Sequence, residues 1–262
     1  MPVPLLVPRE HGAWAMLLLP FFSALALARE ISWEALPAAV VVVGVFLIRE
    51  PLVALWRQAR VWREQARRSL IWYLPPIAAS GLILLWRRPF WPLLITGAAA
   101  ALLIVVSTYL VVHKRPRSLL LQMVSAGGLN ASALVAWLAV RAQFDPTIWW
   151  LWALHFAHSG AALLAVHARL EARVAARTGS EWAAMKKRAT AAQTLLLAAA
   201  AGCVAAGRLG AALALGLSAS VHLADLARLQ DSVFLRTPLR RVGLRELALS
   251  FVFSVVVLAG LW

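Results

Sequence analysis

The stretch AAVVVVGVFLIREPLVALWRQARVWREQARR, residues 38–68, decides the fold of this 262-residue chain. Its first part is almost purely aliphatic and is a helix-length run of the kind that crosses a ~30 Å hydrocarbon core. Its second part carries six arginines within residues 49–69. An apolar helix followed by a dense run of arginine is typical of a membrane span whose next loop lies in the cytoplasm.

The same alternation continues in both directions along the chain. Apolar segments of about 15 to 23 residues, each near the length of a membrane span, are separated by polar connections. Nine of them can be marked, at residues 12–28, 35–49, 70–86, 90–112, 119–140, 148–168, 189–206, 208–222 and 245–262. We therefore predict an all-α, polytopic transmembrane helical bundle of about nine spans, forming a single domain over residues 1–262.

The segments 189–206 and 208–222 are the least certain division, because only Arg208 interrupts one long apolar stretch. We expect a tight hairpin across Gly207 to Gly210. The alternative is a single re-entrant unit over residues 189–222, which would change the side of the C-terminus.

Lysine and arginine are distributed unevenly among the connections. The N-terminal segment and every second connection hold 21 of the 26 basic residues. The remaining connections hold only Arg29, Arg87, Arg88, Arg141 and Arg208. Positive charge gathers on the cytoplasmic side of membrane proteins. We therefore predict a cytoplasmic N-terminus and an outer C-terminus, in the inner or plasma membrane.

Composition agrees with a membrane protein and limits the partners. Hydrophobic residues make up 62% of the chain and charged residues 14%, which is the wrong balance for a soluble domain. The net charge of +15 would suggest nucleic acid in a soluble protein. Here the basic residues flank the spans, so we expect membrane lipids as partners and no nucleic acid. The single cysteine, Cys203, excludes an intramolecular disulfide.

Polar residues within the spans, or at their cytoplasmic ends, are the candidate functional groups because they are costly to place there. Nearly all of them lie in the cytoplasmic half, which predicts a polar cavity open to the cytoplasm. The candidates for catalysis are Glu50, His167, Glu171 and Asp225. The candidates for substrate binding are Glu10, His11, Arg49, Tyr109, Lys114, Arg115, Gln122, Asn130, His158 and His222.

The histidines leave two interpretations open. His167 and Glu171 are four residues apart and share a helix face, which would suit a divalent metal. Two ligands do not define a metal site, so the metal stays unknown. His155 and His158 are three residues apart and can serve metal or proton chemistry, or only hydrogen bonds between helices.

Two motifs resemble a known family. PREHGAWAMLLLP at residues 8–20 and FLIREPL at 46–52 resemble the YwiC-like family of bacterial membrane proteins. With the pattern of spans, that resemblance covers most of the chain. It implies an integral membrane protein and brings no activity with it.

A more distant resemblance concerns the stretch YLVVHKRPRSLLLQ, residues 109–122. It is similar to the Tyr…Lys-Arg…Gln signature of the UbiA superfamily of intramembrane prenyltransferases. Lys114 and Arg115 match the basic pair, whereas Tyr109 and Gln122 each lie about one residue out of the usual register. The resemblance implies a UbiA-like helix arrangement, an isoprenoid or lipid diphosphate as ligand, and Mg²⁺ as cofactor.

The aspartate-rich Mg²⁺ motifs of that superfamily are missing from this sequence. Arg49-Glu50-Pro51 stands in place of the first motif, and the second is at best His167-x-x-x-Glu171. The residues themselves therefore identify no cofactor, and a diverged prenyltransferase is one option among several. Arginine can hold a phosphate directly but does not activate the leaving group as Mg²⁺ does.

Three functions remain open from the sequence. The first is a protein whose cavity binds an isoprenoid or lipid phosphate, with or without prenyl transfer. The second is a small-molecule or proton-coupled transporter that uses His155, His158 and Glu50. The third is a non-catalytic membrane scaffold whose arginine-rich loops bind lipid or a soluble partner.

Overall fold

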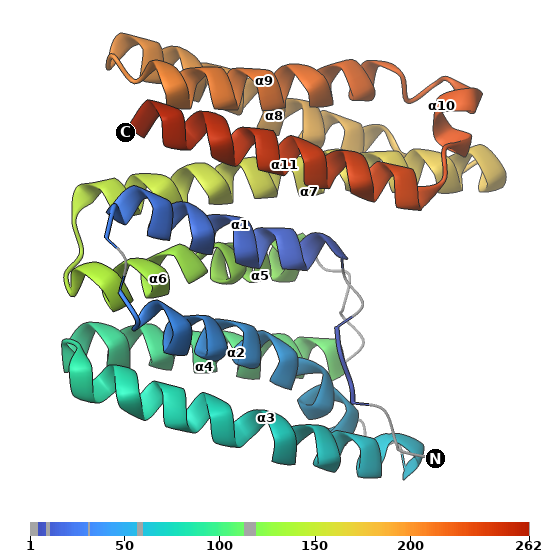
Figure 1. The fold of residues 1–262 in the computed structure, drawn as a ribbon. Coiled ribbons are helices and arrows are strands. Elements are labelled where there is room, and N and C mark those ends of the chain that lie inside the picture. The colour runs from blue at the N-terminus through green and yellow to red at the C-terminus, as the bar shows by residue number, and fades with distance from the viewer. Residues whose placement is uncertain (1–4, 9–10, 31, 57–59, 113–118, 262) are drawn as a thin grey trace. The chain divides into compact units, whose positions relative to one another are not determined.

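The computed structural model describes residues 5–8, 11–30, 32–56, 60–112 and 119–261, with the backbone alone at 11, 60–61 and 111–112. Over these residues the chain is helical and contains no strand (Figure 1). The helices are α1 (His11–Ala28), α2 (Ala35–Trp56), α3 (Arg60–Arg87), α4 (Phe90–Val112), α5 (Leu119–Asn130), α6 (Ser132–Arg141), α7 (Pro146–Thr178), α8 (Ala183–Ala205), α9 (Leu209–Ala227), α10 (Ser232–Arg236) and α11 (Leu239–Leu261). The all-α prediction is confirmed.

Seven helical stretches of the described chain are long and apolar enough to cross a membrane. They are Ala35–Trp56, Trp62–Arg87, Phe90–Leu110, Leu119–Arg141, Ala183–Ala205, Leu209–Ala227 and Leu239–Leu261. The segment Gly12–Ala28 is apolar but shorter. A multi-pass membrane protein follows from these helices, while nine spans and a cytoplasmic N-terminus stay predictions.

Two helices extend well beyond the apolar segments that predicted them. α3 begins at Arg60 within the arginine-rich connection, and α7 continues past residue 168 to Thr178. Arginine, alanine and glutamate are strong helix formers, so these basic stretches continue the helix instead of forming a loop. Gly179 then ends α7 with a φ of +70°, a conformation that glycine adopts without strain.

The span over residues 119–141 is divided into α5 and α6 at Ala131. Two side chains on either side of the break bond to main-chain carbonyl groups. Asn130 Nδ2 donates to Ala126 O at 2.7 Å, and Ser132 Oγ donates to Leu17 O of α1 at 2.6 Å. Such competition with the helix ladder is a recognised cause of a kink.

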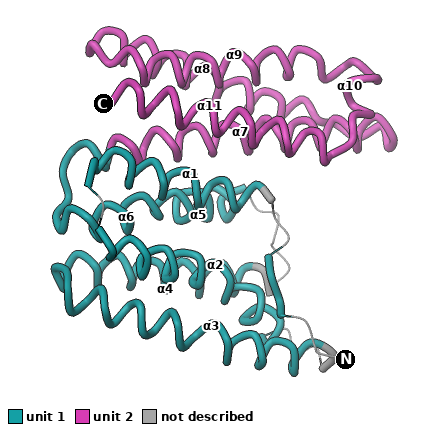
Figure 2. The backbone as a smooth tube through the Cα atoms, in the orientation of Figure 1, with its two compact units in different colours: residues 1–149 teal, residues 150–262 magenta. Residues whose placement is uncertain are grey.

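The chain divides into two compact units, residues 1–149 and 150–262 (Figure 2). In unit 1, α2 packs along α3, and α1 packs along α5 and α6. A methyl group on Gly44 of α2 would meet the Ile77 side chain of α3, so a glycine is needed for this approach. Whether the whole chain is one domain stays a prediction.

Three arginines in the sparsely charged connections of unit 1 form ion pairs. Arg88 Nη2 lies 3.1 Å from Glu34 Oε2, and Arg87 Nε lies 3.6 Å from Glu34 Oε1. Arg141 Nη1 lies 2.8 Å from Glu30 Oε1. Three of the five exceptions to the charge asymmetry are therefore paired with an acid from the connection between α1 and α2.

In unit 2, α9 packs against both α8 and α11. α8 and α9 form the expected hairpin, which turns at Gly207 with a φ of +71°. Backbones come closest between α9 and α11, where a Cβ added to Gly210 would overlap the main chain of Gly260. Small residues allow helices to approach this closely in a membrane. The glycine contact therefore fixes how α9 and α11 align.

α7 is tied to the other helices of unit 2 by apolar packing and by one buried amide. A buried core brings together α7 to α10 through residues such as Ala168, Met185, Leu226 and Phe234. The Gln193 amide of α8, which is completely buried, donates to Ala161 O of α7 at 2.8 Å. α7 thus has a fixed position against α8 and α9 within this unit.

Candidate functional site

Three helices of unit 2 carry polar side chains at helical spacing, in otherwise apolar sequence. They are His155, His158 and Arg169 on α7, Ser218, His222 and Asp225 on α9, and Glu246, Ser250 and Ser254 on α11. Residues three, four or seven apart share one face of a helix. Each helix therefore presents a polar stripe, and hydrogen bonds join the three stripes.

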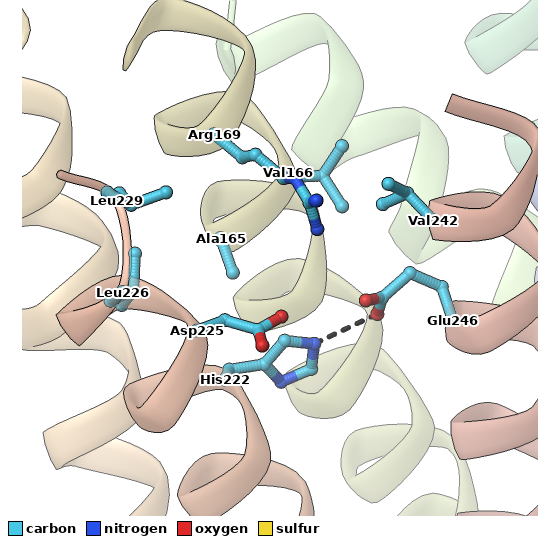
Figure 3. A pocket seen from close by; sticks show the side chains of 9 residues that line it. All are labelled: Ala165, Val166, Arg169, His222, Asp225, Leu226, Leu229, Val242 and Glu246. Carbon is cyan, nitrogen blue, oxygen red and sulfur yellow. Dashed lines mark hydrogen bonds and ion pairs between the residues drawn. The ribbon is translucent and has the colours of Figure 1, made fainter. Parts of the chain in front are cut away.

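The pair His222 and Glu246 is the centre of this arrangement (Figure 3). His222 Nε2 lies 2.9 Å from Glu246 Oε2, and the His222 side chain is only 1% exposed. A carboxylate can only accept a hydrogen bond, so Nε2 carries the proton. Nδ1 is then an acceptor, and it is buried with no hydrogen-bond partner in the structure. An unsatisfied buried nitrogen is uncommon, so we expect a water molecule, an ion or a ligand to bond to it.

Two arginines adjoin the pair. Arg245 Nη1 donates to Asp225 Oδ1 at 2.8 Å, and its Nη2 donates to Asp225 Oδ2 and also to Glu246 Oε1, the latter at 3.2 Å. Arg169 Nη2 donates to Phe234 O at 2.7 Å, and its guanidinium stacks 3.9 Å from the Phe234 ring. The cluster thus joins two cations, two carboxylates and one histidine, which leaves it near electrical balance when His222 is neutral.

These side chains line a small pocket between α7, α9 and α11. Figure 3 shows the carboxylates of Asp225 and Glu246 and the guanidinium of Arg169 pointing toward one another across it. The rest of the lining is His222, Ala165, Val166, Leu226, Leu229 and Val242. Polar groups that converge in an apolar wall are typical of a binding site, and the space here has room for little more than one water molecule or a small ion.

Two further histidines continue the polar stripe of α7 away from the pocket. His158 Nδ1 lies 2.8 Å from Ser218 Oγ of α9, and its Nε2 lies 3.1 Å from Ser250 Oγ of α11. His155 Nδ1 lies 3.0 Å from Leu151 O, and its Nε2 lies 3.2 Å from Ser254 Oγ. Both histidines are 3% exposed. Every ring nitrogen of this pair has a polar partner.

Of the residues singled out from the sequence, the structure brings together His158, His222 and Asp225. His167 and Glu171 lie on α7 outside this cluster: His167 Nδ1 lies 3.0 Å from Leu163 O of its own helix, and Glu171 is exposed. No group of three or more histidine, cysteine, aspartate or glutamate side chains that could hold a metal ion occurs among the residues described. A role for this pair in metal binding or catalysis stays a prediction.

The remaining candidates belong to unit 1. Arg49 and Glu50 of α2 lie 3.8 Å apart, Nη1 to Oε1, and both are partly exposed. Tyr109 of α4 is 49% exposed, and Gln122 of α5 is partly buried. The other five are the completely buried Asn130 at the end of α5, His11 at the start of α1, and Glu10, Lys114 and Arg115, of which the last three lie outside the described residues. Their roles in substrate binding stay predictions.

Sequence reasoning missed Glu246, Arg245 and Arg169. Glu246 is the single acid in residues 239–262. It could have been noticed in the sequence, but this region was considered only for its basic residues. Ser250 and Ser254 follow Glu246 at intervals of four, so all three lie on one helix face. The pairing of that face with α9 depends on how the helices align, which the sequence alone does not contain.

The fold and the buried polar cluster define a multi-pass helical membrane protein. A family model described as YwiC-like protein matches residues 7–138. The chain belongs to this family, as the motifs at residues 8–20 and 46–52 indicated. No curated protein and no solved structure matches the chain. The UbiA-like arrangement and the particular membrane stay predictions.

Proposed function

We propose that the protein is a proton-coupled membrane transporter in which the His222–Glu246 pair binds the proton. The observation that carries this proposal is the burial of that pair between apolar helices beside a pocket. Ionisable side chains inside membrane helices are costly and mark ion or substrate pathways. Histidine is also the side chain whose charge changes most readily near neutral pH.

The contacts of Glu246 support a coupling of proton binding to helix packing. Its carboxylate accepts hydrogen bonds from His222 of α9 and from Arg245 of its own helix. Protonation of Glu246 removes the negative charge that holds both donors. The link between α9 and α11 then weakens on the side that lines the pocket, and a small solute in that pocket would sense the proton.

Binding of an isoprenoid or lipid phosphate is the other function expected from the sequence, and fewer observations favour it. Its phosphate-binding candidates include Lys114 and Arg115, which lie outside the described residues, and Arg49, which adjoins an acid. The pocket in unit 2 is lined by one arginine and two carboxylates, and the second arginine, Arg245, is already bonded to both carboxylates, so the pocket offers little net attraction to a diphosphate. Prenyl transfer with Mg²⁺ therefore ranks second.

The test is proton movement in vesicles. Purified protein is reconstituted into liposomes loaded with the pH-sensitive dye pyranine, and valinomycin with a potassium gradient sets a membrane potential. Pools of amines, amino acids, carboxylic acids and sugars are added outside in turn. We expect the wild-type protein to change the internal pH faster than protein-free vesicles with at least one pool, and Glu246→Gln and His222→Gln to lower the rate about 100-fold.

Glu181→Gln is the matched control, because Glu181 is an exposed carboxylate outside the cluster. It should transport protons at the wild-type rate. Wild-type vesicles that match protein-free vesicles with every pool would overturn the proposal. A change in melting temperature on addition of farnesyl diphosphate with Mg²⁺ would favour the isoprenoid function instead.

A further inference from the structure

The polar stripe of unit 2 does not end at the pocket. Fourteen residues separate Arg169 from His155 on α7, a distance of about 21 Å at the rise of an α-helix. That is most of a hydrocarbon core of about 30 Å. Between these ends the stripe holds His222 with Glu246, then His158, then His155, each at least nine-tenths buried apart from Glu246.

We propose that His158 and His155 form a proton relay that continues from the His222–Glu246 pair through the interior of unit 2. This inference rests on the proposed function, and it assigns the path that the proton takes. The relay residues lie on α7, and the hydroxyl groups of Ser218, Ser250 and Ser254 link them to α9 and α11.

His158 has the geometry of a relay because each of its ring nitrogens faces a hydroxyl group. Ser218 Oγ lies 2.8 Å from Nδ1, and Ser250 Oγ lies 3.1 Å from Nε2. A hydroxyl both donates and accepts, so it can deliver a proton to one nitrogen while the other nitrogen releases one. The ring gains and loses one proton in each passage, and it needs no lasting charge. Rotation of the ring and the hydroxyls restores the starting tautomer.

The hydrogen bonds of His155 also support a role in the relay, because together they need more protons than the neutral ring carries. Nδ1 needs a proton to bond Leu151 O, while Ser254 Oγ uses its own proton to bond Ser250 O at 2.9 Å. The contact between His155 Nε2 and Ser254 Oγ then requires a second proton on the ring. The neutral ring must give up one of these three hydrogen bonds, and the doubly protonated ring makes all three. These hydrogen bonds offset part of the cost of charge on the buried ring while a proton passes.

The connection back to the pocket runs through the unsatisfied nitrogen of His222. The rings of His222 and His158 have centroids 6.4 Å apart, and the proposed step between them needs one bridging water molecule or a rotation of the rings. Ser218, the partner of His158, lies one turn before His222 on α9. His222 Nδ1 has no partner of its own, so it is the nitrogen available for this step.

The experiment uses the full-length protein in the pyranine vesicles described above, under the conditions that give the fastest wild-type rate. Ser218→Ala and Ser250→Ala remove one hydroxyl each and keep both histidines. We expect each to lower the proton rate about tenfold or more, and His158→Gln to lower it about 100-fold, because a positioned proton-transfer group contributes that much. Ser218→Thr and Ser250→Thr restore the hydroxyl and should restore most of the rate.

Thr194→Val is the matched control, since the exposed Thr194 hydroxyl bonds only its own helix at Thr190 O. Melting temperatures of all variants in detergent separate loss of transport from loss of folding, and the threonine variants decide the matter if His158→Gln does not fold. Wild-type transport that is lost in Glu246→Gln but kept in the His158 and serine variants would overturn the relay alone. Absence of wild-type transport would overturn the proposed function, and the relay with it.

Discussion

Two acids of unit 1 form ion pairs in the connections at helix ends, whereas two acids of unit 2 form ion pairs between helices. Glu34 and Glu30 hold the arginines of neighbouring connections. In unit 2 the acids Asp225 and Glu246 belong to α9 and α11 and meet partners a turn or more inside those helices. The pairs of unit 1 hold the connections between helices in place. The pairs of unit 2 place titratable groups between helices, where a change in protonation can alter helix packing.

The family comparison divides the chain at nearly the same place. The matched residues 7–138 fall within unit 1, and every residue of the polar cluster lies beyond them. Membership of the family is therefore established from unit 1 alone. The site proposed here belongs to the unit that the family model does not reach.

The largest expected difference between the units concerns close helix contacts. Gly210→Ala would press a methyl group onto the main chain of Gly260, which cannot move aside, and we expect a loss of about 3 kcal/mol in the free energy of unfolding. Gly44→Ala in unit 1 meets the Cγ1 and Cδ1 atoms of Ile77, a side chain that can shift where a main chain cannot, and should cost about 1 to 2 kcal/mol.

Gly216→Ala is the control on α9, because a Cβ there meets nothing within 4 Å. It should be neutral or slightly stabilising, as alanine favours a helix over glycine. Unfolding in mixed detergent micelles measures all three variants. Equal losses of unfolding free energy for Gly210→Ala and Gly44→Ala would contradict the prediction that the backbone contact in unit 2 tolerates a methyl group less well than the contact in unit 1.

A second comparison uses two arginine–carboxylate pairs with the same 2.8 Å nitrogen–oxygen distance. Asp225→Asn in unit 2 leaves Arg245 partly buried with only Glu246, and we expect a loss of about 2 kcal/mol. Glu30→Gln in unit 1 breaks a pair whose side chains are 52% and 38% exposed, and it should cost well under ~1 kcal/mol. Unfolding measured at neutral pH and moderate salt checks both, and a larger loss for Glu30→Gln would contradict the division between the units.

The smallest expected effect is the pH dependence of the connection between α1 and α2. The Ser32 hydroxyl, and after it the Arg88 guanidinium, lowers the pKa of Glu34 below its usual 4.5, while burial acts in the opposite direction. The contribution of Glu34 to stability is therefore present above pH 4.5 and is lost as the pH falls through the lowered pKa. Because the Glu34 side chain is only 7% exposed and lies 3.1 Å from Arg88, we expect Glu34→Gln to cost about 1 kcal/mol at pH 7. The difference from wild type should vanish in acid, and a difference that grew in acid would show that the pKa is raised.

The sequence was a good guide to the helices because membrane spans are set by local composition. Each of the nine apolar segments coincides with a helix, or with the kinked pair α5 and α6. Their ends were less accurate, since α3 begins at Arg60 and not near residue 70. A charged residue tells where a span leaves the membrane, and it does not tell where the helix ends.

The site could be predicted only in part, for a physical reason. His158, His222 and Asp225 were recognised as costly polar residues within or at the end of a span, a property of each residue by itself. Glu246 and the serines gained their meaning from contacts between α7, α9 and α11. Which faces meet depends on close contacts such as Gly210 with Gly260, and a helical period within one segment carries no information about its neighbour.

That glycine contact also gives α9 and α11 a pivot. Main chain touches main chain at Gly210, and twelve residues along α9 the same two helices are joined by the side chains of His222 and Glu246. A proton can undo the second junction but not the first. The intervening arm is about 18 Å long, so a tilt of about 5° at the glycines would part the helices by about 1.5 Å beside the pocket. In this arrangement α9 and α11 would separate beside the pocket while they stay in contact at Gly210 and Gly260.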